Sequence, residues 1–166
     1  MMLADLNARD KKAFVLALGW IFEDSPWLAE RAWERRPFAS LDALHAAMTQ
    51  IVADADEGEQ LALLRAHPDL GTRAHISDAS TGEQRGAGLD RLTPEEFARL
   101  QRLNDDYRGR FGFPFLFAVK GSTKHEVLAA LESRVARTRE EEFAEALQQV
   151  YKIARFRLED MFGTTR

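Results

Sequence analysis

His67 is the histidine whose place in this sequence best suits it to transfer protons. It follows a helical pattern that must end there, because Pro68 disfavours the helical conformation at the residue before it. Asp69 and Gly71 then favour a turn. Imidazole changes charge near neutral pH, so a histidine held at such a junction could act as a general acid or base. The alternative is a histidine that only binds a backbone carbonyl, and the residues alone favour neither.

Ser80, Glu83 and Gln84 form a second polar group, at spacings of three and four residues. The pattern Ser-x-x-Glu is also a capping box, which would place Ser80 at a helix start. The helix that follows is short and rich in glycine, so packing or a site must hold it. A helix start also presents backbone N–H groups to an anion. Ser80 could therefore cap the helix while Glu83 faces a ligand.

Arg157 is the third candidate, and it lies on or beside the apolar stripe of the expected last helix. Phe156 and Leu158 flank it in the sequence. An arginine there requires a carboxylate partner or an anionic ligand, because burial of an unpaired charge is costly. Spacing alone favours an internal salt bridge, with anion binding as the alternative.

Composition excludes thiol chemistry and disfavours a metal site. The chain has no cysteine, which rules out disulfides, thiolate ligands and a cysteine nucleophile. The four histidines, His45, His67, His75 and His125, form no i, i+4 pair and no His-Glu-x-x-His motif, so no metal is expected. His45 and His125 fall in helix patterns, where structural or solvated roles are expected.

The charge balance argues against a nucleic-acid partner. Lysine and arginine number 23 against 27 aspartate and glutamate residues, so the net charge is −4, and no basic stripe occurs. No run of 18 apolar residues is present, so no membrane span is expected. The first ten residues lack a basic-then-apolar signal pattern, which makes the cytoplasm the expected location.

The elements that must position these residues are helices, because helical signals run along nearly the whole chain and no alternating strand of useful length occurs. Capping residues or first-turn prolines mark the expected helix starts. These starts are Asn7, Ser25-Pro26, Ser40, Ser80, Thr93-Pro94 with Glu96, Thr123, and Thr138 with Glu141. A further helix is expected over about 57–65.

Helix ends and apolar faces complete this pattern. The expected ends are Arg36, Gly109 or Gly112, Ala136 and Gly163. Apolar side chains recur on one helix face at Phe14, Leu18 and Phe22, and again at Leu41, Leu44, Met48 and Val52. The pattern predicts an all-α fold, as a single compact multi-helix domain over residues 1–166 that is long enough for one core.

The segment 111–119 departs from the helical pattern. It is rich in residues that favour strands, but Pro114 interrupts it, so we predict an extended or partly helical buried connection. The second irregular stretch is 68–76. Long loops in compact domains often carry function.

Four motifs occur in order along the chain. They are Ala66-His67-Pro68-Asp69-Leu70-Gly71; Ser80-x-x-Glu83-Gln84 followed by Ala87-Gly88-Leu89; Leu103-Asn104-x-x-Tyr107-x-x-Arg110-Phe111-Gly112-Phe113-Pro114-Phe115; and Ile153-Ala154-x-x-Arg157-Leu158. Each motif alone is modest, but their order and spacing over nearly the whole chain are specific. With these motifs the chain resembles the 2-oxo-4-hydroxy-4-carboxy-5-ureidoimidazoline (OHCU) decarboxylases.

The resemblance implies an OHCU decarboxylase-like fold of about eight helices that forms a homodimer. It implies a carboxy-lyase that converts the small molecule OHCU to (S)-allantoin and carbon dioxide in urate degradation, with no cofactor. The family's catalytic positions fall on His67 and Glu83. Its substrate-contacting positions fall on Pro68, Ser80, Gln84 and Arg157, and on Phe115, Phe117 and Ala118 through the backbone of this stretch.

This chemistry suits a chain without cofactor motifs, because a C=N bond beside the carboxylate-bearing carbon of the substrate can accept the electrons. The protein then supplies orientation, proton transfer and charge stabilisation. We expect His67 to exchange a proton with the substrate and Glu83 to orient His67 or share the transfer. Arg157 and Gln84 are expected to hold its anionic and ureido groups. A non-catalytic helical scaffold, and a hydrolase of a related ureido compound with His67 as base, are the two alternatives.

Overall fold

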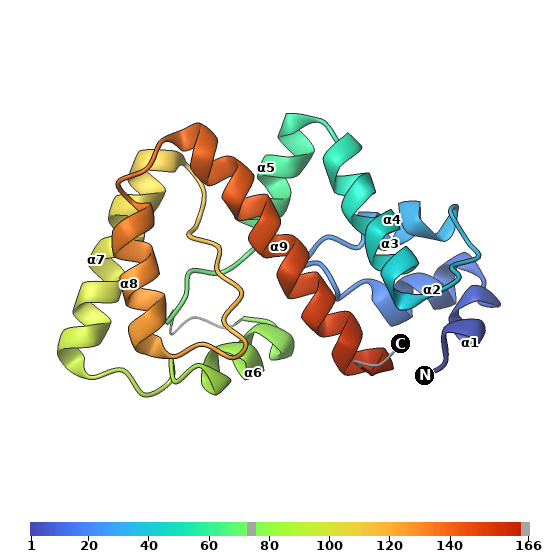
Figure 1. Cartoon of the computed structure of the whole chain (residues 1–166), viewed down its shortest axis with the longest axis horizontal. Helices are drawn as coiled ribbons and strands as arrows, with labels where there is room; N and C mark the ends of the chain where they lie inside the picture. Colours follow the sequence, from blue (N-terminus) through green and yellow to red (C-terminus); the bar gives the residue numbers. More distant parts are fainter. Residues whose placement is uncertain (73–75, 164–166) are drawn as a thin grey trace. The chain divides into compact units, whose positions relative to one another are not determined.

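Nine α-helices and no β-strand make up the described part of the chain, residues 1–72 and 76–163, in the computed structural model (Figure 1). The helices are α1 (Leu3–Asn7), α2 (Lys11–Leu18), α3 (Trp27–Trp33), α4 (Leu41–Asp54), α5 (Glu57–Arg65), α6 (Asp78–Gly86), α7 (Pro94–Phe111), α8 (Lys124–Arg134) and α9 (Arg139–Phe162). The predicted all-α class is confirmed, and the short α1 is the helix that the sequence signals did not indicate. None of the described helices is long and apolar enough to cross a membrane.

The described chain forms two compact units. The first comprises Met1–Ala66 together with the chain from Tyr151 onward, and the second comprises His67–Val150. Helix α9 therefore contributes its N-terminal half to the second unit and its C-terminal half to the first. A single domain over residues 1–166 stays a prediction.

The core of the first unit is built from the apolar faces of its helices, with α3 packed against both α2 and α4. The stripe predicted on α4 is buried, and Leu44, Met48 and Val52 are fully enclosed. Ser40 caps α4 as predicted, because its hydroxyl accepts a hydrogen bond from the Ala43 N–H at 3.0 Å. The helix predicted over 57–65 is α5.

The predicted helix cap at Asn7 is wrong. Asp10 caps α2 instead and accepts a hydrogen bond from the Ala13 N–H at 2.8 Å. Asn7 is the last residue of α1, so its backbone is already helical and cannot adopt the extended cap conformation. Its side chain binds both backbone groups of Phe38, donating to the carbonyl at 3.0 Å and accepting from the N–H at 2.9 Å.

The predicted cap at Ser25 is also wrong. Its hydroxyl donates to the Glu23 carbonyl at 2.8 Å. Pro26 occupies the N-cap position of α3, which therefore has no side-chain cap. Helices α2 and α3 both end earlier than predicted, before Phe22 and Arg36, because the chain continues in turns closed by i to i+3 hydrogen bonds. Phe22 is nevertheless buried.

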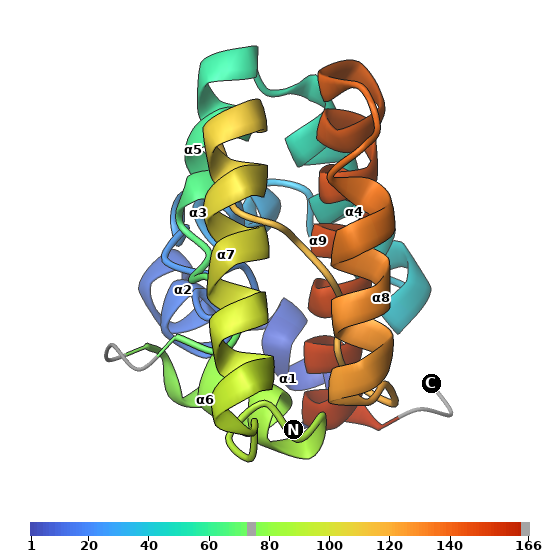
Figure 2. The same cartoon turned by 90° about the vertical axis from the view of Figure 1, so that its left-hand side faces the viewer.

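In the second unit, α7 and α8 run in the same direction and are joined by a connection over residues 112–123 (Figure 2). The capping boxes predicted at Thr93 and Thr138 and the cap predicted at Thr123 are confirmed. Helix α7 ends at Gly112, whose φ of +82° is a left-handed conformation that glycine adopts without strain. Helix α8 ends two residues before the predicted Ala136.

The connection between α7 and α8 is the extended, buried segment predicted for this stretch, and it supplies part of the core of the second unit. Phe113, Phe115 and Leu116 are almost fully buried. The ring of Tyr107 meets Phe113 and Phe115 edge-on, with centroids 6.0 and 5.4 Å apart. The connection is therefore packed along its length rather than free as a surface loop.

Candidate active site

His67 is the first residue of the second unit, and the predicted helix end before it is confirmed. Helix α5 closes at Ala66, and Pro68 opens a loop. The histidine is only 6% exposed although it lies outside any helix. Such burial restricts the imidazole to few orientations, as proton transfer to a bound molecule requires.

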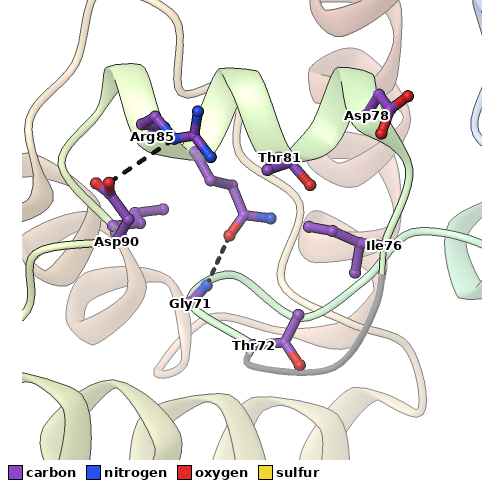
Figure 3. Close-up of a pocket in the computed structure, with 9 residues that line it drawn as sticks. Gly71, Thr72, Ile76, Asp78, Thr81, Arg85 and Asp90 are labelled. Carbon is purple, nitrogen blue, oxygen red and sulfur yellow. Dashed lines mark hydrogen bonds and ion pairs between the residues drawn. The ribbon is translucent and has the colours of Figure 1, made fainter.

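The loop after His67 is held by two helices. The Gly71 N–H donates to the Gln84 side-chain oxygen at 2.9 Å, which ties the loop to α6 (Figure 3). The Asn104 amide donates to the Leu70 carbonyl at 3.0 Å, which ties the loop to α7. Gly71 has a φ of +74°, and a Cβ there would lie 2.4 Å from Leu100 Cδ2, so only glycine fits.

The predicted capping box at Ser80 is wrong, because α6 begins one turn earlier. Ser77 is the cap, and its hydroxyl accepts a hydrogen bond from the Ser80 N–H at 3.1 Å. Ser77 is as good a cap as Ser80, and Asp78 stabilises the added turn because an acidic group is favourable at a helix start. Ser80 therefore lies inside the helix, and its N–H is already used within the protein.

This earlier start places three predicted site residues inside α6 on one face. Ser80, Glu83 and Gln84 have the i, i+3 and i+4 spacing that makes residues neighbours on a helix. Ser80 and Gln84 are 5% and 8% exposed, and Glu83 is half-buried. The buried face of α6 is therefore polar, because the helix has few apolar side chains.

A pocket of about 330 Å³ opens beside this face (Figure 3). Its described lining residues are Gly71, Thr72, Ile76, Asp78, Thr81, Gln84, Arg85, Leu89 and Asp90. Figure 3 shows Asp78, Thr81 and Arg85 projecting from α6, and the Arg85 and Asp90 side chains approach to 3.9 Å. Gln84 is the predicted site residue among these lining residues, and the mixture of hydroxyl, amide and charged groups suits a polar ligand.

The stretch 115–118 is fixed by side chains from α8 and α9. Arg134 donates to the Leu116 carbonyl at 2.7 Å, and its guanidinium lies 4.5 Å from the centre of the Phe115 ring. The Ala118 N–H donates to the Gln149 side-chain oxygen at 2.9 Å. Phe115 is 2% exposed, whereas Phe117 and Ala118 are half-buried.

Gln149 thus occupies a backbone donor of the stretch that the resemblance assigns to substrate. Its own orientation is set by a bond from its amide nitrogen to Glu145 at 2.8 Å. A ligand that is to bind Ala118 would therefore use the carbonyl, or would displace Gln149. The Ala118 contact with substrate stays a prediction.

A buried charged group, Glu142, anchors the same region. It is fully buried and accepts hydrogen bonds from the Tyr107 hydroxyl at 2.6 Å, Arg134 Nε at 2.8 Å and Arg137 Nη1 at 3.0 Å. Burial, followed by the bond to Glu142, raises the pKa of Tyr107 well above its usual value, so the hydroxyl keeps its proton. This arrangement satisfies a carboxylate that would otherwise be very costly to bury.

Arg134, Glu142 and Gln149 were not predicted from the sequence. A signal was available for Arg134, because it continues the apolar face of Val127 and Leu131 at helical spacing. A charged residue within an apolar stripe indicates a buried partner. The identity of that partner depends on contacts between helices, which spacing does not reveal.

Arg157 lies in the first unit and is 2% exposed. Its Nη1 is 3.3 Å from a carboxylate oxygen of Glu23, which is 3% exposed, and 3.1 Å from the Trp20 carbonyl. The internal salt bridge favoured by spacing alone is therefore present. A contact between Arg157 and substrate stays a prediction.

The other histidines do not assemble a metal site among the described residues, where no group of three histidine, aspartate or glutamate side chains is placed to hold an ion. His45 Nε2 lies 2.8 Å from the Tyr151 carbonyl, in a structural role. His125 is exposed, as predicted. His75 lies outside the described residues.

Comparison with known proteins gives consistent matches. The sequence model described as OHCU decarboxylase matches residues 7–159. The chain is 48% identical to the 2-oxo-4-hydroxy-4-carboxy-5-ureidoimidazoline decarboxylase of Halalkalicoccus jeotgali, over 97% of this chain and 92% of that protein.

Solved structures that are similar to this chain include two crystal structures. One is the crystal structure of (S)-allantoin synthase, with a TM-score of 0.82 and 37% identity. The match covers 99% of this chain and 55% of that longer one. The other is a crystal structure of OHCU decarboxylase in the presence of (S)-allantoin, which covers 94% of this chain and all of that one. Its TM-score is 0.73 at 20% sequence identity, so this similarity shows a shared fold alone.

Proposed function

This chain belongs to the OHCU decarboxylase family, and from this premise we propose that it releases carbon dioxide from OHCU and yields (S)-allantoin. The observation that carries the proposal is the hydrogen bond from the Gly71 N–H to the Gln84 side chain. It joins the loop that follows His67 to the helix that carries Glu83. The two proposed catalytic residues therefore lie on elements that are fixed to each other.

The proposed reaction breaks the bond between C4 of OHCU and its carboxylate carbon. The electron pair forms a C4=C5 double bond, and the nitrogen of the former C5=N bond takes a proton. The 4-hydroxyl then loses its proton and becomes a carbonyl, while C5 takes a proton on one face. The products are carbon dioxide and allantoin, with uptake of one proton for each carboxylate consumed.

His67 is the proposed acid and base for these proton movements, because an imidazole both accepts and returns a proton near neutral pH. Glu83, half-buried on α6, would orient the imidazole or share the transfer. Delivery of the C5 proton from one side sets the (S) centre. Since the substrate contains its own electron acceptor, no cofactor enters the scheme.

Binding is assigned to the residues at the substrate-contacting positions that the family resemblance implies. The Gln84 side-chain oxygen is engaged by Gly71, so its amide nitrogen is the end that can donate to a carbonyl or carboxylate of the substrate. The Ser80 hydroxyl, on the same face, is a second proposed donor. The remaining proposed contacts come from Pro68, Arg157 and the stretch that contains Phe115, Phe117 and Ala118.

We infer further that the active protein is a homodimer and that it works in the cytoplasm on this small molecule. Both inferences rest on the family to which the chain belongs. The balance of 23 basic and 27 acidic residues gives no reason to propose a nucleic-acid partner.

A coupled assay tests the proposed function. Urate oxidase and hydroxyisourate hydrolase would generate OHCU in place, and circular dichroism would follow optically active allantoin. Rapid growth of the (S) signal with the protein present is the expected result. Racemic allantoin at the spontaneous rate, with folded protein in the cuvette, would contradict the proposal. Consumption of OHCU without release of carbon dioxide would favour the hydrolase.

A further inference from the structure

Asn104 of α7 is a buried amide that is not among the proposed catalytic or substrate-binding residues. It is 6% exposed, and its Nδ2 donates to the Leu70 carbonyl at 3.0 Å. Its Oδ1 is buried and has no hydrogen-bond partner among the described residues. The amide is thus used at one end only, and that end holds the loop that follows His67.

The neighbouring turns of α7 hold the same loop in register. One turn before Asn104, Leu100 packs against Gly71 so closely that a Cβ there would lie 2.4 Å from Leu100 Cδ2. One turn after it, Arg108 donates to the Asp69 carboxylate at 2.8 Å. Successive turns of α7 therefore contact successive residues of the loop: Leu100 contacts Gly71, Asn104 contacts Leu70 and Arg108 contacts Asp69.

These three contacts differ in strength. The Arg108–Asp69 pair is exposed, with 47% and 36% of the side chains accessible, so water and salt weaken it. The Leu100 contact is steric and has no directional preference. The Asn104 bond is the buried, directional contact of the three, and it fixes the height of the loop backbone against α7.

The loop transmits this constraint to His67 over a short distance. Pro68 has a fixed φ, so few backbone rotations separate Leu70 from the histidine. On the other side the loop is tied to α6 through Gln84. The position of His67 relative to Glu83 therefore depends on where α7 holds Leu70.

We propose that Asn104 is a positioning residue that sets the imidazole of His67 for proton transfer, an inference that rests on the proposed function. Its unsatisfied Oδ1 opposes the stabilisation that its bond supplies, so its loss changes the stability of the fold little. The effect of its loss lies in turnover, because small displacements of a catalytic group reduce rates strongly.

The test compares Asn104→Leu with Asn7→Leu. Leucine branches at Cγ as asparagine does and has no amide. Asn7 is the matched control, because it also donates to a backbone carbonyl, that of Phe38 at 3.0 Å, in the first unit. In the coupled assay we expect Asn104→Leu to lower kcat by about tenfold to a hundredfold with KM within about threefold. Asn7→Leu should keep kcat within about twofold.

A second readout does not depend on activity. The imidazole signals of His67 in NMR spectra, assigned with His67→Asn, should move in Asn104→Leu and stay in place in Asn7→Leu. If Asn104→Leu does not fold, Asn104→Ser replaces it, because serine leaves room for water at the Leu70 carbonyl. A wild-type kcat, or unmoved imidazole signals, in the folded variant would overturn the proposal. If the wild-type chain has no activity, the proposed function fails, and the NMR comparison still decides whether Asn104 holds His67.

Discussion

His67 and Arg157 are both buried polar residues, but substitution at each position has a different chemical consequence. Loss of the imidazole removes the proposed proton-transfer group from a site that is only 6% exposed. Loss of the guanidinium leaves the Glu23 carboxylate, which is 3% exposed, without the cation beside it. Substitutions at the two positions therefore affect different measurements.

We predict that His67→Asn lowers kcat by about a hundredfold or more, since general acid–base catalysis contributes about 10²–10⁴-fold. Asparagine retains hydrogen-bonding groups but does not titrate near neutral pH. The measurement is the growth of the (S)-allantoin signal. His45→Asn is the control, because His45 contacts the Tyr151 carbonyl in a structural role and its loss should leave kcat within about twofold. Turnover of His67→Asn within threefold of wild type would remove His67 from the mechanism.

Arg157→Met should lower the free energy of unfolding by about 3–5 kcal/mol, because it removes the cation beside the buried Glu23 carboxylate. The double variant Arg157→Met with Glu23→Gln should recover at least half of that loss in urea titrations. If Arg157 also holds substrate, the double variant will be folded and still show a raised KM. A wild-type KM in the folded double variant would assign Arg157 to the salt bridge alone.

The partner of Arg157 shows what the sequence could not reveal. The apolar neighbours of Arg157 indicate burial and a need for a counter-charge, and both predictions are confirmed. The identity of the partner depends on how the chain folds, because Glu23 is 134 residues away in the sequence. The same holds for Glu142, whose partners come from three different helices or turns.

At the scale of elements, local signals located several caps correctly but failed at Ser25, because α3 starts without a side-chain cap. Thr93, Thr123 and Thr138 start their helices as predicted. Predictions failed where two capping residues compete within one turn, because Ser77 precedes Ser80 and Asp10 follows Asn7. The choice between such competitors depends on packing and on the preceding helix, so the presence of α6 could be predicted but its N-terminus could not.

Glu96 gives a prediction about acid stability. The hydrogen bond from Lys124, followed by the backbone bond from Thr93, holds the pKa of Glu96 below its usual range. The stability that this carboxylate contributes is therefore present above the usual glutamate pKa of about 4.3 and is lost as the pH falls through the lowered pKa.

Glu96→Gln should keep the capping box, since glutamine also serves there, and lose the ion pair with Lys124. The unfolding free energies of wild type and variant should differ at pH 7 and converge below about pH 4. Glu95→Gln, on the same first turn, is the control for removal of one negative charge. If the unfolding free energies of wild type and Glu96→Gln still differ by the same amount in acid, the charge of Glu96 does not cause the difference.

At the scale of the whole molecule, the division into two units was not visible in the sequence, because no linker or change of composition marks residue 66 or residue 150. The boundary at 150 falls inside a continuous helix, where local signals are uniform. Sequence patterns describe elements well, but the grouping of elements depends on contacts over long separations.

The proposed homodimer is the prediction that belongs to this scale. Sedimentation equilibrium at the enzyme concentration of the assay should give twice the 18.8 kDa mass of the chain. Dilution should then lower specific activity if the dimer is the active form. A monomer mass with full activity would contradict the homodimer.

Helix α9, which belongs to both units, also affects when each unit can fold during synthesis. The second unit is an unbroken stretch of sequence, so all of its residues are synthesised before Tyr151 onward. Residues 1–66 of the first unit are made before the second unit, but they lack the chain from Tyr151 onward until the second unit has been synthesised. At a synthesis rate of about 5–20 residues per second, the apolar faces of their helices stay uncovered for several seconds. Residues 1–66 are thus the part of the nascent chain most in need of a chaperone.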